Sequence, residues 1–475
     1  MRVEKDSVGT LEVPDDVYYG IQTVRGKANF DVSPKTFNDY PNVLKAYAEV
    51  KKACAFANRD INALAPEKAE AISKACDEIV AGKLAGQFPV NVFRGCGTSA
   101  NMNMNEVIAN RANEILTGKR GYDQVHPNTH VNMCQSSNDI FPTVESVVIY
   151  REIGTLLETI PLLENALEAK SREFADVVKI ARTSLQDALP ITLGQAFSGY
   201  VAAIKRNRLL LEGYQNTFRE AILGATAVGT GMGVMPGFIE NVYKYMSDIV
   251  GFPMHRHENL IDGMQNADHF IILSAYVKAI AGMVGKIAND FRQLSSGPRG
   301  GFNELILPDM GASCAIMPDK VNPVIPELMV QMMHQVCAND WGISLSVPSG
   351  ETDIVPSAVI NFMGSLESME ILTKGIKLFT THCVEGLGAN VEVCHRYAEG
   401  STSLATMVSA LYGYEIGNKI AKISYEQGVT CKEVAIQENL LPLDVAEELF
   451  DIKKLTELES TVAMFEKYKD IRRVN

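Results

Sequence analysis

The feature that most constrains the fold is a long stretch of helical periodicity, from about Thr143 to Val393. Apolar residues recur there every three or four positions, as in VESVVIYREIGTLLETIPLLENALEAKSREFADVV and DHFIILSAYVKAIAGMVGKIANDFRQL. Several of these segments are apolar on more than one face, so each helix needs neighbours on several sides. A bundle that continues across subunit boundaries satisfies this need better than a monomer does. No strand alternates regularly with the helices, which disfavours a doubly wound dinucleotide-binding fold. The pattern predicts an all-α protein with a long central helical bundle.

Changes in this pattern along the chain predict three domains. The first thirty residues are extended and turn-like, and shorter helical segments follow them. After Val393 the helical segments shorten and the tail becomes charged. We expect an N-terminal domain at 1–137, a central helical bundle domain at 138–393 and a small C-terminal helical domain at 394–475.

Charge and cysteine content exclude several classes of protein. The chain has 44 basic and 57 acidic residues and a formal net charge of −13, which argues against nucleic-acid binding and against a polybasic membrane patch. Its nine cysteines are scattered and show no CxxC spacing, so the sequence supports neither a disulfide framework nor a zinc ribbon. The N-terminus lacks an apolar signal core, and the longest uncharged stretch, 221–239, is interrupted by glycines and Pro236. These features predict a soluble, cytoplasmic protein without metal or cofactor.

Two segments rich in small polar residues precede predicted helices in the first third of the chain. GCGTSANMNMNEVIANR, at 95–111, presents Thr98 just before a helix. HPNTHVNMCQSSNDIFPTVES, at 126–146, places Ser136, Ser137 and Asn138 where a long helix begins. Free N–H groups and the positive dipole end make a helix N-terminus a natural carboxylate site. Ordinary N-capping is the alternative interpretation, because Ser and Asn cap helices routinely.

Two further polar segments interrupt the long helices. RTSLQDALPITLGQAF, at 182–197, carries Thr183 and Ser184. The glycine-rich loop SSGPRGGFNELILPDMGASCAIMPDKVNP, at 295–323, ends with Cys314, Lys320 and Asn322 within nine residues. A loop of this length inside a helical protein is usually functional or disordered. Lysine pairs with a carboxylate and asparagine can hydrogen-bond it, so these residues predict a second carboxylate contact.

Taken together, several motifs in order resemble the aspartase/fumarase superfamily. The matching segments are GTSANMNMNEVIANR, HVNMCQSSNDIFPT, LGATAVGTGMG, LSSGPRGGFNELILP and IMPDKVNPVIPE. The resemblance extends from YYGIQTVRGKANF near the start to GYEIGNKIAKI near the end, and thus covers essentially the whole chain. It is closer to aspartate ammonia-lyase, although QSSND and the HPN opening are fumarase-like.

The resemblance implies a fold, an assembly and a reaction. Members of the superfamily are three-domain homotetramers with a central twenty-helix core, and each active site is shared by three subunits. They catalyse anti-elimination across a Cα–Cβ bond without metal in the chemical step. A base removes the Cβ proton, and an aci-carboxylate dianion forms before the amine leaves. Such a dianion requires preorganised hydrogen-bond donors around one carboxylate.

The same resemblance assigns roles to particular residues. Thr98 matches a residue near the amino group and the β-carboxylate. Ser136, Ser137 and Asn138 match the site for the β-carboxylate and the amine. Thr183 matches a further substrate contact, and Lys320 with Asn322 matches the clamp on the α-carboxylate.

The signature loop departs from the superfamily pattern at its catalytic base. The loop normally reads GSSIMPxKxNP, whereas this chain has SCAIMPDKVNP, so Cys314 stands at the base position and Ala315 follows it. A thiol ionises more readily than a hydroxyl, and Lys320 would favour the thiolate, but a thiolate is the weaker base and suits a more acidic proton. We expect Cys314 to act as the base, with Ser313 as a substitute if the loop shifts. The alternative is that Cys314 is inert.

Two more departures bear on the substrate. Ser184 occupies a position that is His or Gln in the relatives, and Ala196 replaces the Glu of GQEF. Together with Ala315, the smaller residue at Ser184 leaves room near the amine or the β-substituent. We therefore predict a lyase that removes ammonia or an amine from aspartate or an aspartate-like amino acid, giving fumarate or a related unsaturated acid. The alternatives are an amine lyase with a changed substrate, a fumarate hydratase and a degenerate non-catalytic homologue.

The HPNTH segment admits a different interpretation. His126 and His130 are four residues apart, which on a helix would suggest a metal site, but Pro127 and Asn128 favour a turn. The superfamily uses this region as a secondary anion site. Here Thr129 and Met133 replace the Asp and the Lys of that site, which argues against the anion role as well.

Overall fold

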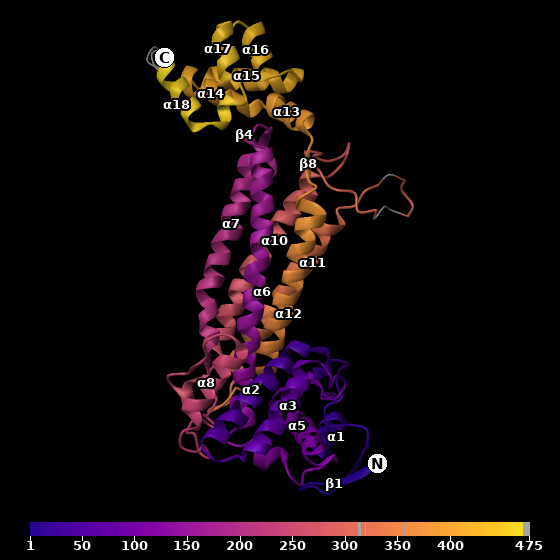
Figure 1. The fold of residues 1–475 in the computed structure, drawn as a ribbon. Coiled ribbons are helices and arrows are strands. Elements are labelled where there is room, and N and C mark those ends of the chain that lie inside the picture. Colours follow the sequence, from indigo (N-terminus) through magenta and orange to yellow (C-terminus); the bar gives the residue numbers. More distant parts are fainter. Residues whose placement is uncertain (312–314, 319, 356–357, 469–475) are drawn as a thin grey trace. The chain divides into compact units, whose positions relative to one another are not determined.

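The computed structural model describes residues 1–311, 315–318, 320–355 and 358–468 (Figure 1). The protein is mostly helical with a few short two-stranded sheets, which confirms the predicted all-α class. Contacts divide the chain into two compact units. Unit 1 comprises Met1–Leu157, Leu210–Lys278 and Gln335–Ile371, and unit 2 comprises Glu158–Leu209, Ala279–His334 and Leu372–Asn475. This division differs from the three predicted domains, which stay a prediction.

Five long helices account for about half of the predicted periodic stretch. They are α6 (Ser137–Glu173), α7 (Leu193–Tyr214), α10 (Asp268–Leu294), α11 (Val324–Ser346) and α12 (Ala358–Phe379). Each of the five contributes residues to both units. Within this chain α7 and α11 bury only part of their surface, and apolar residues such as Leu209, Trp341 and Leu345 are exposed on them.

Unit 1 also contains shorter helices. They are α1 (Ile21–Asn29), α2 (Pro41–Asp60), α3 (Pro66–Val80), α4 (Val92–Arg94), α5 (Ala100–Thr117), α8 (Phe238–Val250) and α9 (Leu260–Gln265). Among them, α2 packs against α3 and α8, and α5 packs against α1 and α3. The ring of Phe141 contacts Phe37, Tyr47 and Phe362 at centroid distances of 5.8 to 6.5 Å. These contacts fix the N-terminal end of α6 in the core of the unit.

Two small sheets complete unit 1. Strand β1 (Arg2–Lys5) pairs antiparallel with β2 (Thr10–Val13), with Arg2 opposite Val13. Strand β5 (Glu220–Ala221) pairs in parallel with β6 (His255–Arg256).

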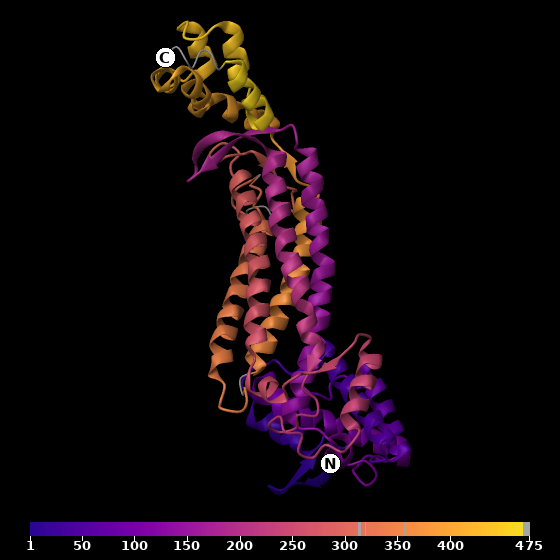
Figure 2. The ribbon, with the colours of Figure 1, turned by 90° about the vertical axis from the view of Figure 1, so that its left-hand side faces the viewer.

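In unit 2, segments of α6, α7, α10 and α12 lie side by side (Figures 1 and 2). The ring of Phe197 on α7 stacks on Phe291 of α10 at 5.5 Å and meets Phe174 edge-on at 5.4 Å. Phe291 also contacts Phe379 at 5.6 Å. These four buried rings tie the helices together at this level.

The C-terminal helices share a hydrophobic cluster of their own within unit 2. They are α13 (Val391–Gly400), α14 (Ala405–Tyr412), α15 (Tyr414–Gln427), α16 (Cys431–Gln437), α17 (Leu443–Leu449) and α18 (Leu458–Lys467). Two short strands, β7 (Leu305–Ile306) and β8 (Gly388–Ala389), pair antiparallel.

The polar segment at 182–197 forms a β-hairpin followed by a helix. Strand β3 (Val178–Thr183) pairs antiparallel with β4 (Gln186–Thr192), and Thr183 stands opposite Gln186. The two turn residues, Ser184 and Leu185, have φ values of +54° and +60°. A two-residue turn with both φ values positive is the usual connection in a tight hairpin.

Among the described residues, one helix, α10, is long and apolar enough to cross a membrane by length and composition alone. Half of its most apolar window is buried inside the protein. Core helices of soluble proteins pass the same test, so a single such helix is weak evidence for a membrane span.

Candidate active site

The N-terminus of α6 carries three of the predicted substrate-binding residues. The backbone N–H of Asn138 donates to Ser136 Oγ at 3.2 Å, and the backbone N–H of Ser136 donates to Asp139 Oδ1 at 2.8 Å. Ser136 therefore caps the helix, as the alternative interpretation of this segment proposed. The side chains of Ser137 and Asn138 come next on the helix and are half-buried.

The GTSAN segment, at 97–101, and the QSSND segment, at 135–139, are joined by a side-chain hydrogen bond. Asn101, at the start of α5, donates from Nδ2 to Ser137 Oγ at 3.0 Å and to Asn132 Oδ1 at 3.0 Å. Thr98 is exposed in the π-helical turn Gly95–Ser99 directly before α5. The structure thus brings the two segments together, as their predicted common role requires.

A buried lysine, which sequence reasoning did not single out, lies behind this arrangement. Lys51 on α2 is 1% exposed, and its Nζ donates to Gln135 Oε1 at 2.8 Å and to Asn132 Oδ1 at 3.1 Å. Burial lowers the pKa of Lys51 to about 7. In the sequence, the position of Lys51 within the apolar run AYAEVKKACAFA could have indicated a buried lysine. Lys52 lies in the same run, however, so the sequence does not show which of the two is buried.

Asp139 connects the start of α6 to the LGATAVG segment. Its Oδ2 accepts from the backbone N–H of Thr226 at 2.8 Å and of Gly224 at 3.1 Å. Burial raises the pKa of Asp139 to about 7, although these N–H donors and Lys51 oppose the shift. The buried carboxyl therefore holds the loop at 224–226 against the start of α6.

The other predicted substrate contacts belong to unit 2. Lys320 and Asn322 line a cavity of about 1120 Å³ together with Leu185, at the turn of the β3–β4 hairpin. Lys320 is exposed and Asn322 is half-buried. Thr183 and Ser184 are exposed next to Leu185. Within unit 2, the structure therefore brings the KVNP segment and the hairpin to one cavity.

The predicted base lies outside the described residues, as does its substitute: these are Cys314 and Ser313. Ala315, which follows Cys314, is exposed. The predicted site residues fall into two groups: Thr98, Ser136, Ser137 and Asn138 lie in unit 1, and Thr183, Ser184, Lys320 and Asn322 lie in unit 2.

The HPNTH segment forms a single π-helical turn, Pro127–Val131. The ring of His126 accepts from the backbone N–H groups of Asn128 and Thr129, each at 3.2 Å, and His130 lies 3.3 Å from Lys68 Nζ. These contacts match the turn that Pro127 and Asn128 favoured. Among the described residues, no three His, Cys, Asp or Glu side chains are grouped to hold a metal ion.

A family model matches about two thirds of the chain, and known relatives match nearly all of it. A family model described as Lyase matches residues 9–338. An aspartate ammonia-lyase of Helicobacter pylori strain J99 is 39% identical over 472 residues, which cover 99% of this chain and 100% of the relative. The aspartate ammonia-lyase of Escherichia coli K12 is 36% identical over 458 residues, which cover 96% of each chain.

Solved structures match to a similar extent. A crystal structure of a fumarate lyase:delta crystallin from Brucella melitensis is 41% identical with a TM-score of 0.92, and the match covers 96% of this chain and 99% of that one. A class II fumarase from Schistosoma mansoni is 31% identical with a TM-score of 0.92 and the same coverage. The resemblance inferred from the motifs is therefore confirmed, and the chain belongs to the lyase family that includes the aspartate ammonia-lyases and the fumarases.

Proposed function

We propose that this protein is a carbon–nitrogen lyase that removes ammonia, or an amine, from L-aspartate or an aspartate-like amino acid. The product is fumarate or a related unsaturated acid. The observation that carries the proposal is the match to aspartate ammonia-lyases at 36% and 39% identity over nearly the full length of both chains. The joined GTSAN and QSSND segments support it, because they present donors where a carboxylate would bind.

The β-carboxylate binds, in this proposal, at the N-terminus of α6. Ser137 and Asn138 supply a hydroxyl and an amide there, and Thr98 and Ser136 supply two more hydroxyls. Removal of the Cβ proton places a second negative charge on this carboxylate. Fixed donors and the positive end of the helix dipole stabilise that charge without reorganising during the reaction.

The α-carboxylate is held by Lys320 and Asn322, with Thr183 and Ser184 as further substrate contacts. Cys314 removes the Cβ proton as a thiolate, and Ser313 is its substitute. The electrons of the Cβ–H bond then form the carbon–carbon double bond, and those of the Cα–N bond leave with the nitrogen. Lys320, six residues from Cys314, favours the thiolate form of the base.

The proposed assembly is a homotetramer with a twenty-helix core and active sites shared by three subunits. Two observations support it: the five long helices are apolar on several faces, and the predicted site residues fall into two compact units. We further propose a three-domain chain that acts in the cytoplasm on small dicarboxylates or amino acids. It would bind neither nucleic acid nor membrane and would need no cofactor.

A fumarate-absorbance assay tests the proposal. Purified protein is incubated with L-aspartate, L-malate and N-methyl-L-aspartate, and the formation of fumarate is followed. We expect fumarate from an amino-acid substrate and none from malate, and loss of that activity in Cys314→Ala. Turnover of malate alone would instead assign a fumarate hydratase.

The Cys314→Ser variant separates the remaining alternatives. If the native protein releases fumarate from no amine while Cys314→Ser turns over aspartate, the native chain is a degenerate homologue. If native turnover exceeds that of Cys314→Ser, the thiol is the base.

A further inference from the structure

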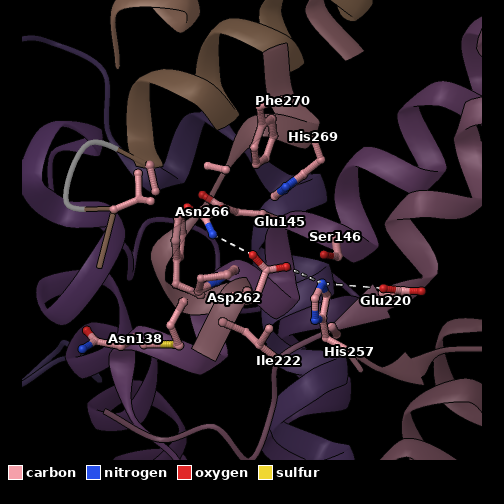
Figure 3. Close-up of a pocket in the computed structure, with 18 of the residues that line it drawn as sticks. Asn138, Glu145, Ser146, Glu220, Ile222, His257, Asp262, Asn266, His269 and Phe270 are labelled. Atoms are coloured by element: carbon pink, nitrogen blue, oxygen red, sulfur yellow. Dashed lines mark hydrogen bonds and ion pairs between the residues drawn. The ribbon is translucent and has the colours of Figure 1, made fainter. Parts of the chain in front are cut away.

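A cavity of about 340 Å³ in unit 1 adjoins the N-terminus of α6 (Figure 3). It begins at Ser137 and Asn138 and continues past Phe141 to Glu145. Residues three and four apart share one face of a helix, so this side of the cavity is a stripe along α6. Every described lining residue belongs to unit 1. The cavity is therefore continuous with the proposed carboxylate site but extends well beyond it.

Glu145 is buried in this cavity without a partner for one of its oxygens. The residue is 3% exposed, and its Oε1 has no hydrogen-bond partner within the described part of the chain. Figure 3 shows the side chain of Glu145 next to Asn266, outside the chain of hydrogen bonds and ion pairs that joins Asn266, Asp262, His257 and Glu220. Burial raises the pKa of Glu145 well above its usual value. An unpaired buried carboxyl is costly, and a cation bound beside it would remove that cost.

Most of the titratable groups that line the cavity are acidic. The other carboxyl groups are Glu220, Asp262 and Asp268, and the described lining includes neither Lys nor Arg. His257 Nε2 lies between Glu220 Oε2 at 3.7 Å and Asp262 Oδ2 at 3.8 Å. Burial lowers the pKa of His269 to about 4, so this ring is neutral at neutral pH. The cavity thus has an excess of acidic groups.

The rest of the lining is apolar. Phe141, Phe218, Ile222, Met264 and Phe270 contribute side chains, and each is buried in the protein. An apolar pocket with a few convergent polar groups is typical of a small-molecule site. A ligand that complements this cavity carries one positive charge on an apolar body.

We propose that this cavity binds an organic ammonium ion with an apolar body, with the Glu145 carboxylate as its counter-ion. Such an ion has two possible sources, which share the same chemistry. It can be a free amine, or it can be the amine substituent of an aspartate bound at Ser137 and Asn138. The second source rests on the proposed lyase function, whereas the first does not.

Cleavage of an N-substituted aspartate balances in the same way as cleavage of aspartate. The base takes the Cβ proton, the carbon–carbon double bond forms, and the Cα–N bond breaks. The nitrogen, which is a substituted ammonium in the substrate, keeps its protons and takes the bonding pair. It leaves as a neutral amine.

Binding of an ammonium ion to the full-length protein tests the proposal. Benzylammonium is the probe, benzyl alcohol is its uncharged match, and calorimetry at pH 7 measures both. We expect benzylammonium to bind about tenfold or more tightly than benzyl alcohol. Because burial raises the pKa of Glu145, a cation that favours the carboxylate should also promote proton release on binding; two buffers of different ionisation heat measure this release. Equal binding of the two ligands, or no binding, would overturn the proposal without requiring any variant.

Variants then assign the counter-ion. Glu145→Gln should weaken benzylammonium binding about tenfold or more and abolish the proton release. Glu158→Gln makes the same change at an exposed position of α6 and should alter neither. An unchanged affinity in Glu145→Gln would overturn the assignment. Loss of the native oligomer in Glu145→Gln would also overturn it, because the carboxyl would then serve a subunit contact.

The source of the amine is decided by a second assay. If the native protein releases fumarate from N-benzyl-L-aspartate and Glu145→Gln does so more slowly, the cavity holds the amine substituent of the substrate. Binding of benzylammonium without cleavage of N-benzyl-L-aspartate supports the free amine. Turnover of L-aspartate without any binding of benzylammonium overturns this inference and leaves the proposed function standing.

Discussion

Asn101 Nδ2 donates a hydrogen bond to Ser137 Oγ at 3.0 Å, so the first turn of α5 holds the hydroxyl at the N-terminus of α6. The same amide donates to Asn132 Oδ1, which also accepts from Lys51 and Asn105. This network fixes the position of the proposed β-carboxylate site from within the core of unit 1. Its members are buried or half-buried, so removal of one of these side chains should lower both the unfolding free energy and the catalytic activity.

Asn101→Ala should lower kcat/KM more than its effect on folding explains. The variant leaves Ser137 free to rotate and removes a buried hydrogen bond, at a cost of about 1 to 3 kcal/mol in unfolding free energy. Asn105→Ala is the matched control, because Asn105 donates to Asn132 at 3.2 Å but has no hydrogen bond to Ser137. Fumarate-absorbance kinetics and denaturant unfolding compare the two variants. An equal loss of kcat/KM in both variants would contradict the role of Asn101 in positioning the Ser137 hydroxyl.

Lys51→Met should change how stability depends on pH. In the folded protein the pKa of Lys51 is about 7, below its usual value, so the unfolded chain binds the extra proton between those two pKa values. The contribution of Lys51 to the unfolding free energy therefore rises with pH from about 7 toward 10. Unfolding of native protein and Lys51→Met at pH 7 and pH 9.5 measures this contribution.

Lys52→Met is the control for this pH dependence. Lys52 is the next residue on α2, and its Nζ donates to Asp77 Oδ1 at 2.7 Å. We expect Lys51→Met, but not Lys52→Met, to flatten the rise in stability between the two pH values. Parallel pH profiles for native protein and Lys51→Met would contradict the low pKa.

Leu185→Gly should stabilise the protein. Leu185 has φ of +60° at the hairpin turn and is 64% exposed, so glycine relieves a left-handed conformation and removes little packing. The expected gain is about 1 kcal/mol in unfolding free energy. Leu189→Gly, at a 51% exposed position of β4 without positive φ, should instead destabilise. A loss of stability in Leu185→Gly would show that the turn is not strained.

Arg182→Met should strongly destabilise unit 2. Glu304 is fully buried, with Arg182 Nη1 at 2.9 Å and Lys179 Nζ at 3.4 Å from its Oε2. Because Lys179 stays beside Glu304, the expected loss is that of a hydrogen bond to a charged group, about 1.5 to 3 kcal/mol. Arg172→Met, at an exposed pair with Glu168, should change little. Adding Glu304→Gln to Arg182→Met should recover part of the loss; no recovery would contradict the electrostatic cause.

Sequence patterns predicted the helical class because helical periodicity is local and the apolar faces of α6 and α10 are long. They also located the start of α6, since the QSSND residues have the local chemistry of a helix N-terminus. The sequence did not predict the β3–β4 hairpin. Tight hairpin turns with positive φ usually contain Asn or Gly, whereas this turn contains Ser184 and Leu185.

The chemistry of the chain's polar motifs, and with it the family, was determined by the sequence alone. The order of the motifs and their residue types can be read directly from the sequence. Ser137, Asn138, Lys320 and Asn322 could therefore be identified without a structure. Only the tertiary structure showed that Lys51 lies behind the QSSND segment and that Glu145 lines a cavity beside it. The physical reason is burial: whether a charged residue on a helix faces water or the core depends on what packs against it, and that packing comes from distant parts of the chain.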